Sequence, residues 1–239
     1  MKIAILGLPG GGKSSVFRAA TGRGHDHHSG DDLAGLKVPD ARLARIVEFY
    51  KSKKITMAEL ALVDVTALTR GEDVASRQRH LSQLAADADA FALVIQGFGS
   101  MDYTGGDLDP RSDLETLLLE LALTDLDVIA RRIERIQTGP KADRSQFELK
   151  TLQKAHDHLA EGGLVVGLDL SPEEQKTLRG FRLLTGRPML VVLNVAEDDH
   201  QGERVAGARE YADALGLRSI LFCAELEEEL AAIPEDERE

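Results

Sequence analysis

The segment GLPGGGKS at residues 7–14 constrains the fold of this chain more than any other part of its sequence. It matches the phosphate-loop pattern G-x-x-x-x-G-K-[ST], in which glycines let the backbone wrap closely around an anion. The apolar run at residues 3–6 is typical of a buried strand, and residues 15–20 are typical of the start of a helix. A glycine-rich turn without a ligand is the alternative, but these flanks favour a site for a nucleoside phosphate.

The residues of this loop have distinct expected roles. Lys13 would reach the β- and γ-phosphates, and the Ser14 hydroxyl would hold Mg²⁺. Backbone N–H groups of the loop and of the helix start would face the phosphates. The predicted nucleotide-binding residues of this segment are Leu8, Pro9, Gly10, Gly11, Gly12, Lys13, Ser14 and Ser15.

The composition narrows the class of protein. Hydrophobic residues make up 43% of the 239 positions, enough for one α/β domain with or without an insertion. The net charge of −12 disfavours nucleic acid as a partner of the whole surface. The single cysteine excludes an internal disulfide and suits a reducing compartment. Because the chain starts with its first strand and has no apolar run as long as a membrane span, we expect a cytoplasmic protein with no signal peptide and no membrane contact.

Further apolar runs predict the fold class. They lie at residues 60–63, 90–95, 189–193 and 220–222, and helical patterns cover about 74–88 and 203–215. Nearly continuous apolar strands are typical of a sheet covered on both faces. Strands that alternate with helices after a phosphate loop predict an α/β fold of the P-loop NTPase, GTPase-like kind. Its sheet would be mostly parallel, flanked by helices, with the ligand at the carboxyl ends of the strands.

The middle of the chain has a helical pattern instead. From Arg111 to about Gln137, aliphatic residues recur mostly three or four positions apart, as in a coiled-coil seam: Leu114, Leu118, Leu121, Leu126, Ile129, Ile133 and Ile136. Gly139 and Pro140 would end this helix, and a second helix would follow, with the stripe Leu149, Leu152 and Leu159. We therefore predict an antiparallel helical hairpin inserted between strands of the sheet.

This hairpin divides the chain into two predicted domains. Residues 1–110 and 185–239 would form the nucleotide-binding domain, and residues 111–184 the inserted helical domain. A third helix is expected to begin at Ser171, because serine is a good helix cap and Pro172 suits the first helical position.

The tip of the hairpin is locally basic. Between Arg131 and Lys154 the sequence contains seven basic residues and three acidic ones. This makes the tip a candidate contact for RNA, the ribosome or an acidic protein face. An ordinary solvated helix surface is the alternative. Phe147 is the only aromatic residue among them, so base stacking is not indicated.

Two later segments complete the predicted site. Asp64 directly follows a strand and fits the carboxylate that holds Mg²⁺, although it could also be a simple strand-end cap. The usual D-x-x-G pattern ends here in Ala67, whose Cβ restricts the peptide flip toward the γ-phosphate. After the strand at 189–193, Asn194, Val195 and Glu197 stand where GTP-binding proteins usually have N-K-x-D. This loop does not require guanine.

Several segments resemble the YchF, or Obg-like ATPase, family of P-loop proteins. They occur in family order over nearly the whole chain: GLPGGGKSSVF (7–17), LKVPDARL (36–43), KKIT (53–56), LVDVTAL (62–68), ADAFALVIQGF (88–98), DPRSDLETLLLELALTDLDVIARRIERI (109–136), RPMLVVLNVAEDD (187–199) and FCAELEEEL (222–230). The resemblance implies an inserted helical hairpin and binding of ATP/ADP, with GTP/GDP as the alternative. It also implies that a loop of Cys223, Ala224 and Glu225 joins Asn194, Val195 and Glu197 around the base. Family members continue into a small TGS domain, so we expect either a divergent member that lacks this domain or a sequence that is a piece of a longer protein.

Departures from the family pattern leave the degree of catalysis open. Residues 21–36 contain no clear match to the family's first-switch threonine, and Glu225 stands where a lysine is usual. These changes affect hydrolysis more than binding, and no catalytic base is assigned. One hypothesis is a slow Mg²⁺-dependent ATPase acting as a regulatory or ribosome-associated switch. The other is a hydrolysis-deficient, nucleotide-gated interaction module. A metallochaperone NTPase that uses His25, His27 and His28 is a third, weaker hypothesis, because one short tract offers no preformed metal geometry.

Overall fold

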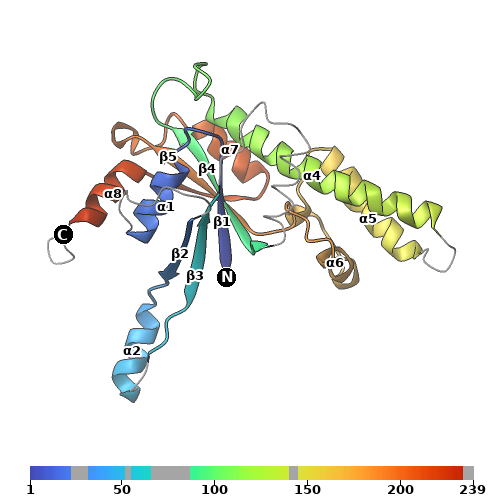
Figure 1. Cartoon of the computed structure of the whole chain (residues 1–239), viewed down its shortest axis with the longest axis horizontal. Helices are drawn as coiled ribbons and strands as arrows, with labels where there is room; N and C mark the ends of the chain where they lie inside the picture. Colours follow the sequence, from blue (N-terminus) through green and yellow to red (C-terminus); the bar gives the residue numbers. More distant parts are fainter. Residues whose placement is uncertain (23–31, 52–54, 66–86, 140–144, 234–239) are drawn as a thin grey trace.

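The computed structural model describes residues 1–22, 32–51, 55–65, 87–139 and 145–233. Within these ranges, a six-stranded sheet has the order β2-β3-β1-β4-β5-β6 (Figure 1). The strands are β1 (Lys2–Leu6), β2 (Asp32–Lys37), β3 (Glu59–Asp64), β4 (Ala90–Gly97), β5 (Met189–Val195) and β6 (Arg218–Phe222). The α-helices are α1 (Lys13–Thr21), α2 (Ala41–Tyr50), α4 (Pro110–Thr138), α5 (Gln146–Ala160), α6 (Pro172–Arg179), α7 (Ala206–Ala214) and α8 (Ala224–Ala232).

The sheet is mostly parallel, as predicted. β1 pairs in parallel with β3 and β4, and the series continues through β5 to β6. Edge strand β2 is antiparallel to β3. The strands expected from apolar runs are all present. Strand β2 and helices α2 and α8 were not predicted.

Helices cover both faces of the sheet with aliphatic side chains. One core cluster joins the sheet to α4 and α7, through residues such as Leu117 and Ala208. The other joins it to α1 and α8, through residues such as Phe17 and Ala224. Figure 1 shows these helix pairs on opposite sides of the strands. This two-sided burial explains why the strands are nearly continuous apolar runs.

Helices α4 and α5 form the insertion between β4 and β5 and lie side by side (Figure 1). Asp109 caps α4 by accepting the Ser112 N–H at 3.0 Å, and Gly139 ends the helix. The Arg132 guanidinium joins the two helices through hydrogen bonds of 2.7 and 3.0 Å to Glu148. The second half of the predicted α4 seam is buried with the α5 stripe, through Ile129, Ile136, Leu152 and Leu159. The first half was expected in the same seam, but Leu114, Leu118 and Leu121 pack against the sheet instead.

Helix α4 contributes to two cores. Its first half places Leu114, Leu117 and Leu121 in the cluster against the sheet. Its second half places Ile129 and Ile136 in the cluster shared with α5 and α6. The division into two domains at residues 110 and 111 stays a prediction. Helix α4 runs without a break through both cores, so its first half packs with the sheet although it lies within the predicted inserted domain.

Asp125 lies where these two cores meet. Its carboxylate accepts the N–H groups of Leu184 and Thr185 at 2.7 and 2.8 Å and the Thr185 hydroxyl at 2.6 Å. Burial raises the pKa of Asp125, and these three hydrogen bonds partly oppose that shift. The carboxylate thereby fixes the chain that leads from the insertion back into β5.

Other predicted elements have separate outcomes. The third helix of the insertion is α6, which begins with a capping box between Ser171 and Glu174. Most of the helix expected at about 74–88 lies outside the described residues. Among the helices that the structure describes, none has the length and apolar character needed to cross a membrane.

Candidate nucleotide site

The phosphate loop joins β1 to α1 at the carboxyl end of the sheet, as the sequence predicts. Gly10 and Gly12 have φ angles of 76° and 83°, which side chains with a Cβ rarely adopt. A Cβ on Gly12 would also collide with the Asn194 amide. Within the described part of the chain no side chain caps the start of α1, so the first N–H groups of this helix stay open to an anion.

Lys13 lies over this loop rather than pointing into solvent. Its ammonium donates to the Leu8 carbonyl at 3.2 Å, and the side chain is 8% exposed. Burial lowers the pKa of Lys13, while the negative charge of Asp64 opposes the shift. A phosphate beside this ammonium would supply the charge partner that burial demands.

Asp64 ends β3 at the same edge of the sheet. Its Oδ1 is buried and has no hydrogen-bond partner within the described part of the chain. A buried carboxylate oxygen without a donor is costly, and a cation or its water shell would satisfy it. Ser14, in the first turn of α1, is exposed at the loop. This donor set of carboxylate and hydroxyl oxygens suits Mg²⁺.

Asn194 links three elements of the site. From β5, its amide Nδ2 donates to the Gly11 carbonyl at 3.2 Å, and its Oδ1 accepts the Ala224 N–H of α8 at 3.1 Å. The side chain is 3% exposed. Asn194 therefore positions the phosphate loop against the helix expected near the base.

The segment predicted as a loop at Cys223, Ala224 and Glu225 is the start of helix α8. Cys223 is its cap residue, and the next two positions form its first turn. The Glu-rich sequence that follows consists of good helix formers, which explains the difference. Arg18 of α1 bonds Glu228 of α8 at 2.6 Å and holds the two helices together.

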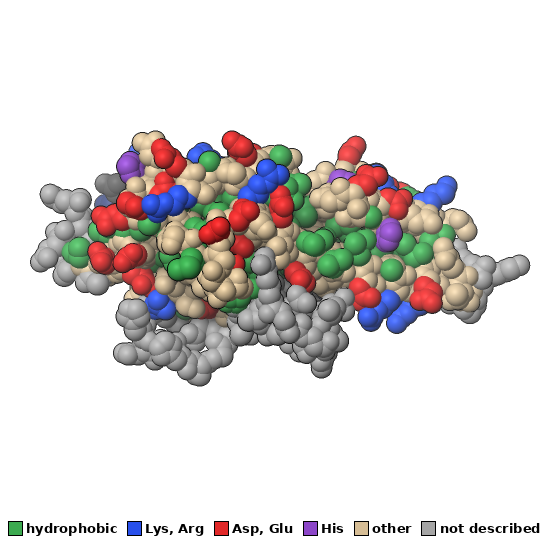
Figure 2. All heavy atoms as spheres, turned by 90° about the horizontal axis from the view of Figure 1, so that it is seen from above, with side chains coloured by type: hydrophobic (Ala, Val, Ile, Leu, Met, Phe, Trp, Pro, Cys, Tyr) green, Lys and Arg blue, Asp and Glu red, His purple; other side chains and the backbone are tan. Residues whose placement is uncertain are grey.

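Glu197 and Glu225 meet at an open hollow of about 500 Å³, lined also by Ala196 and Asp198. Val195 differs, since its side chain packs in the main core. Figure 2 shows acidic side chains spread over the half of the molecule that carries α8. The hollow presents carboxylate acceptors, which suits a base with exocyclic or ring N–H donors.

Two side chains near the phosphate loop were missed by sequence reasoning. Gln96, in β4, donates to the carbonyls of Phe98 and Met101 at 3.1 Å and shapes the following loop. That loop places Tyr103 against Gly10, and the Tyr103 hydroxyl is buried with no partner among the described residues. Only their position could have indicated them. Gln96 is the second-last residue of β4 and Tyr103 follows the end of this strand, and ligands of such sheets bind at the carboxyl ends of the strands.

Several other predicted features lie outside the described residues. They are Ala67, the histidines His25, His27 and His28, most of the segment 21–36, and Lys141 and Arg144 of the basic hairpin tip. The switch elements and the histidine-loop hypothesis therefore remain predictions.

The fold and this loop define the class of protein: a P-loop nucleotide-binding protein with a GTPase-like sheet. No protein-family model matches the chain. It is similar to the ribosome-binding ATPase YchF of Bacillus subtilis, with 30% identity over 98% of this chain and 68% of the relative. It is also similar to Obg-like ATPase 1 of Oryza sativa subsp. indica, with 28% identity over 99% of this chain and 64% of the relative. The solved YchF GTPase of Schizosaccharomyces pombe has the same fold, with a TM-score of 0.77 and 24% identity over 100% of this chain and 69% of that chain. The chain belongs to the YchF family of P-loop ATPases.

Proposed function

We propose that this protein binds ATP with Mg²⁺ and hydrolyses it slowly. The phosphate loop supports this most directly, since it combines open helix N–H groups with a buried lysine. Lys13 would bind the β- and γ-phosphates, and Ser14 with Asp64 would hold Mg²⁺. When bound, the ion would neutralise charge on the phosphates.

The reaction needs little covalent chemistry from the protein. Water attacks the γ-phosphorus in line and ADP leaves, which yields ADP and inorganic phosphate. The loop amides and Lys13 would stabilise the charge on the transferred group. Tyr103, whose Cβ lies beside Gly10 and whose hydroxyl has no partner among the described residues, would donate a hydrogen bond to a phosphate oxygen.

ATP is the proposed nucleotide, and GTP is the alternative. Glu197 replaces the aspartate that holds guanine in GTP-binding proteins, and its side chain is longer by one methylene. Glu225 brings a second carboxylate to the same hollow. Direct binding of ATP, ADP, GTP and GDP tests this assignment, and a strong guanine preference would contradict it.

Ribosome association is proposed from the relatives, which are named ribosome-binding ATPases. The basic hairpin tip is the surface predicted for such a contact. Three of its basic side chains already have partners: Arg131 with Asp127, Arg132 with Glu148, and Lys154 with Glu174 and the Asp169 carbonyl. A contact through this tip stays a prediction.

Single-turnover phosphate release from ATP and GTP tests the enzymatic proposal. Lys13→Ala should weaken ATP binding about tenfold to a hundredfold, because it removes a charge-assisted contact. Lys176→Ala, at an exposed position of α6, is the matched control and should behave as wild type. Equal phosphate release by wild type and Lys13→Ala would refute the ATPase and favour the interaction module.

A further inference from the structure

A segment outside the nucleotide site projects from the edge of the sheet. This arm, residues 37–51 and 55–59, contains α2 and lies between β2 and β3 along the chain. Figure 1 shows α2 well apart from the other helices. Strand β3 begins in the arm at Glu59 and ends at Asp64, so the arm and the phosphate site lie at opposite ends of this strand.

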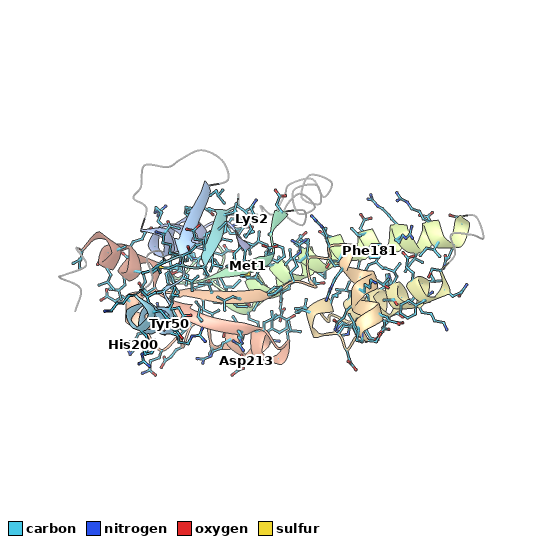
Figure 3. All side chains as sticks on the ribbon, turned by 90° about the horizontal axis from the view of Figure 1, so that it is seen from below. Met1, Lys2, Tyr50, Phe181, His200 and Asp213 are labelled. Carbon is cyan, nitrogen blue, oxygen red and sulfur yellow. The ribbon has the colours of Figure 1, made fainter. Side chains whose placement is uncertain are left out.

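One face of α2 carries both aromatic and basic side chains. Its exposed residues follow the spacing of a single helix face: Arg42, Arg45, Ile46, Phe49 and Tyr50. Phe49 is 81% exposed and Tyr50 is 71% exposed. Tyr50 is labelled in Figure 3, which looks at the molecule from the side on which the arm projects. Helices of globular proteins normally bury large apolar and aromatic side chains, so this exposed face is suited to contact with a partner.

The two aromatic rings form an edge-to-face pair. Their centroids lie 5.0 Å apart with an interplanar angle of 73°. This arrangement leaves ring faces available beside the pair, and nucleic-acid bases stack on such faces without sequence preference.

The charge of the arm is opposite to that of the whole chain. In the sequence, residues 37–59 contain six basic and three acidic residues, while the chain carries a net charge of −12; two of the six, Lys53 and Lys54, lie outside the described residues. Arg42 is paired with Asp40 through bonds of 3.0 and 2.9 Å. Arg45 and Lys51 have no ion-pair partner within the described ranges. The arm therefore offers a polyanion the positive charges of Arg45 and Lys51, unpaired within those ranges, on a chain that is acidic as a whole.

We propose that the arm binds single-stranded RNA, with bases stacked on Phe49 and Tyr50 and phosphates near Arg45 and Lys51. A membrane surface fits less well, because interfacial helices separate an apolar face from a charged one, whereas Arg42 and Arg45 share the face of Ile46 and Phe49. This proposal depends on the proposed ribosome association in one respect only, namely that the ribosome would be the source of the RNA in the cell.

The arm and the hairpin tip give different expectations for the same ligand. The hairpin tip has one aromatic residue, Phe147, and three of its basic side chains are already paired. The double variant Phe49→Ala/Tyr50→Ala removes exposed rings and so should leave folding intact. The matched control is Phe147→Ala, which removes a half-exposed ring from α5.

Fluorescence anisotropy with a labelled oligouridine of about twelve nucleotides tests the arm. The Phe49→Ala/Tyr50→Ala variant should bind at least about tenfold more weakly than wild type, because stacking on two rings is lost. Arg45→Gln should lower the slope of log affinity against log salt by about 0.7, the value for one phosphate contact of a single strand. Phe147→Ala and Lys13→Ala should bind as wild type does.

Each other outcome overturns the proposal in a recognisable way. Equal RNA binding by wild type and the arm variant would exclude the arm as the site. Binding to anionic phospholipid vesicles without binding to RNA would identify a membrane surface, and self-association lost in the variant would identify a second copy of the chain. Sedimentation with ribosomes and ATP binding are measured in parallel. If wild type does not sediment with ribosomes or does not bind ATP, but still binds RNA through the arm, the proposed function is contradicted and the RNA site on the arm is supported.

Discussion

Asp64 and Asp125 both have carboxylate oxygens inside the protein, but their surroundings differ. Asp125 accepts three hydrogen bonds from Leu184 and Thr185. Asp64 keeps a buried oxygen with no partner within the described residues. Buried polar groups that serve the architecture are normally satisfied, and exceptions call for a ligand or a functional role. Asp125 therefore stabilises the fold, whereas the unsatisfied oxygen of Asp64 supports its proposed role in holding a cation.

Removing the Asp125 carboxylate should produce the largest change in stability. Asp125→Ala leaves the N–H groups of Leu184 and Thr185 buried without acceptors, at a cost of about 3 kcal/mol in the free energy of unfolding. Urea denaturation measures this cost. ATP affinity of the folded fraction should be unchanged, and a loss of affinity without a loss of stability would reverse the roles given to the two carboxylates.

Asp64→Asn should have the opposite profile. Stability should change by less than about 1 kcal/mol, because no hydrogen bond to Oδ1 is lost. ATP affinity in Mg²⁺ should fall about tenfold, toward the value measured in EDTA. Isothermal titration calorimetry with and without Mg²⁺ makes the comparison. An undiminished Mg²⁺ effect in the variant would exclude Asp64 as part of the metal site.

The two carboxylates should also differ in pH dependence. Burial raises the pKa of Asp125 in the folded state above its unfolded value. The folded protein therefore binds more protons between these two pKa values. The stability contributed by the protonated form is complete below the unfolded pKa and is lost as pH rises through the folded pKa.

Measurement of unfolding free energies from mildly acidic to neutral pH tests this sign. Subtracting the unfolding free energy of Asp125→Asn from that of wild type cancels the contributions of the other titrating groups. This difference should become less favourable to wild type as pH rises. A difference that moves in favour of wild type would show that hydrogen bonds outweigh burial at Asp125.

Tyr103→Phe should have the smallest effect. It removes a hydroxyl that has no protein partner among the described residues, so stability should stay equal or rise slightly. If the hydroxyl donates to a phosphate, ATP affinity should fall by about 1 kcal/mol, or roughly fivefold. Equal affinities for ATP in the two proteins would remove Tyr103 from the site.

The sequence predicted those parts of the fold whose buried residues form a recognisable aliphatic pattern. The apolar strands and the long seam of α4 are recognisable because both depend on continuous aliphatic patterns. β2 was missed because its sequence, DLAGLK, mixes polar residues and glycine at an edge of the sheet. α2 was missed although Leu43, Ile46, Val47 and Tyr50 recur three or four positions apart, as on one face of a helix; Ile46 and Tyr50 are nonetheless exposed, so this stripe does not pack into a core.

The candidate site divides in a similar way. The phosphate loop and Asp64 were predicted because a local pattern specifies them. The bridge that Asn194 makes between Gly11 and Ala224 joins residues 183 and 30 positions away from it, which only the folded chain brings together. Tyr103 lies in a loop whose course depends on Gln96, and no periodic signal marks it.

Helix α4 has a mechanical consequence. Its 29 residues make a rod about 43 Å long, and only its first half is packed against the sheet. The part beyond Asp125 extends about 20 Å further and carries α5 with it. A rotation of the rod by about 5° around this anchor would move its far end by nearly 2 Å. The fold thus contains a rigid rod whose first part, about 24 Å long, rests on the nucleotide-binding sheet and whose second part, about 20 Å long, carries the hairpin tip.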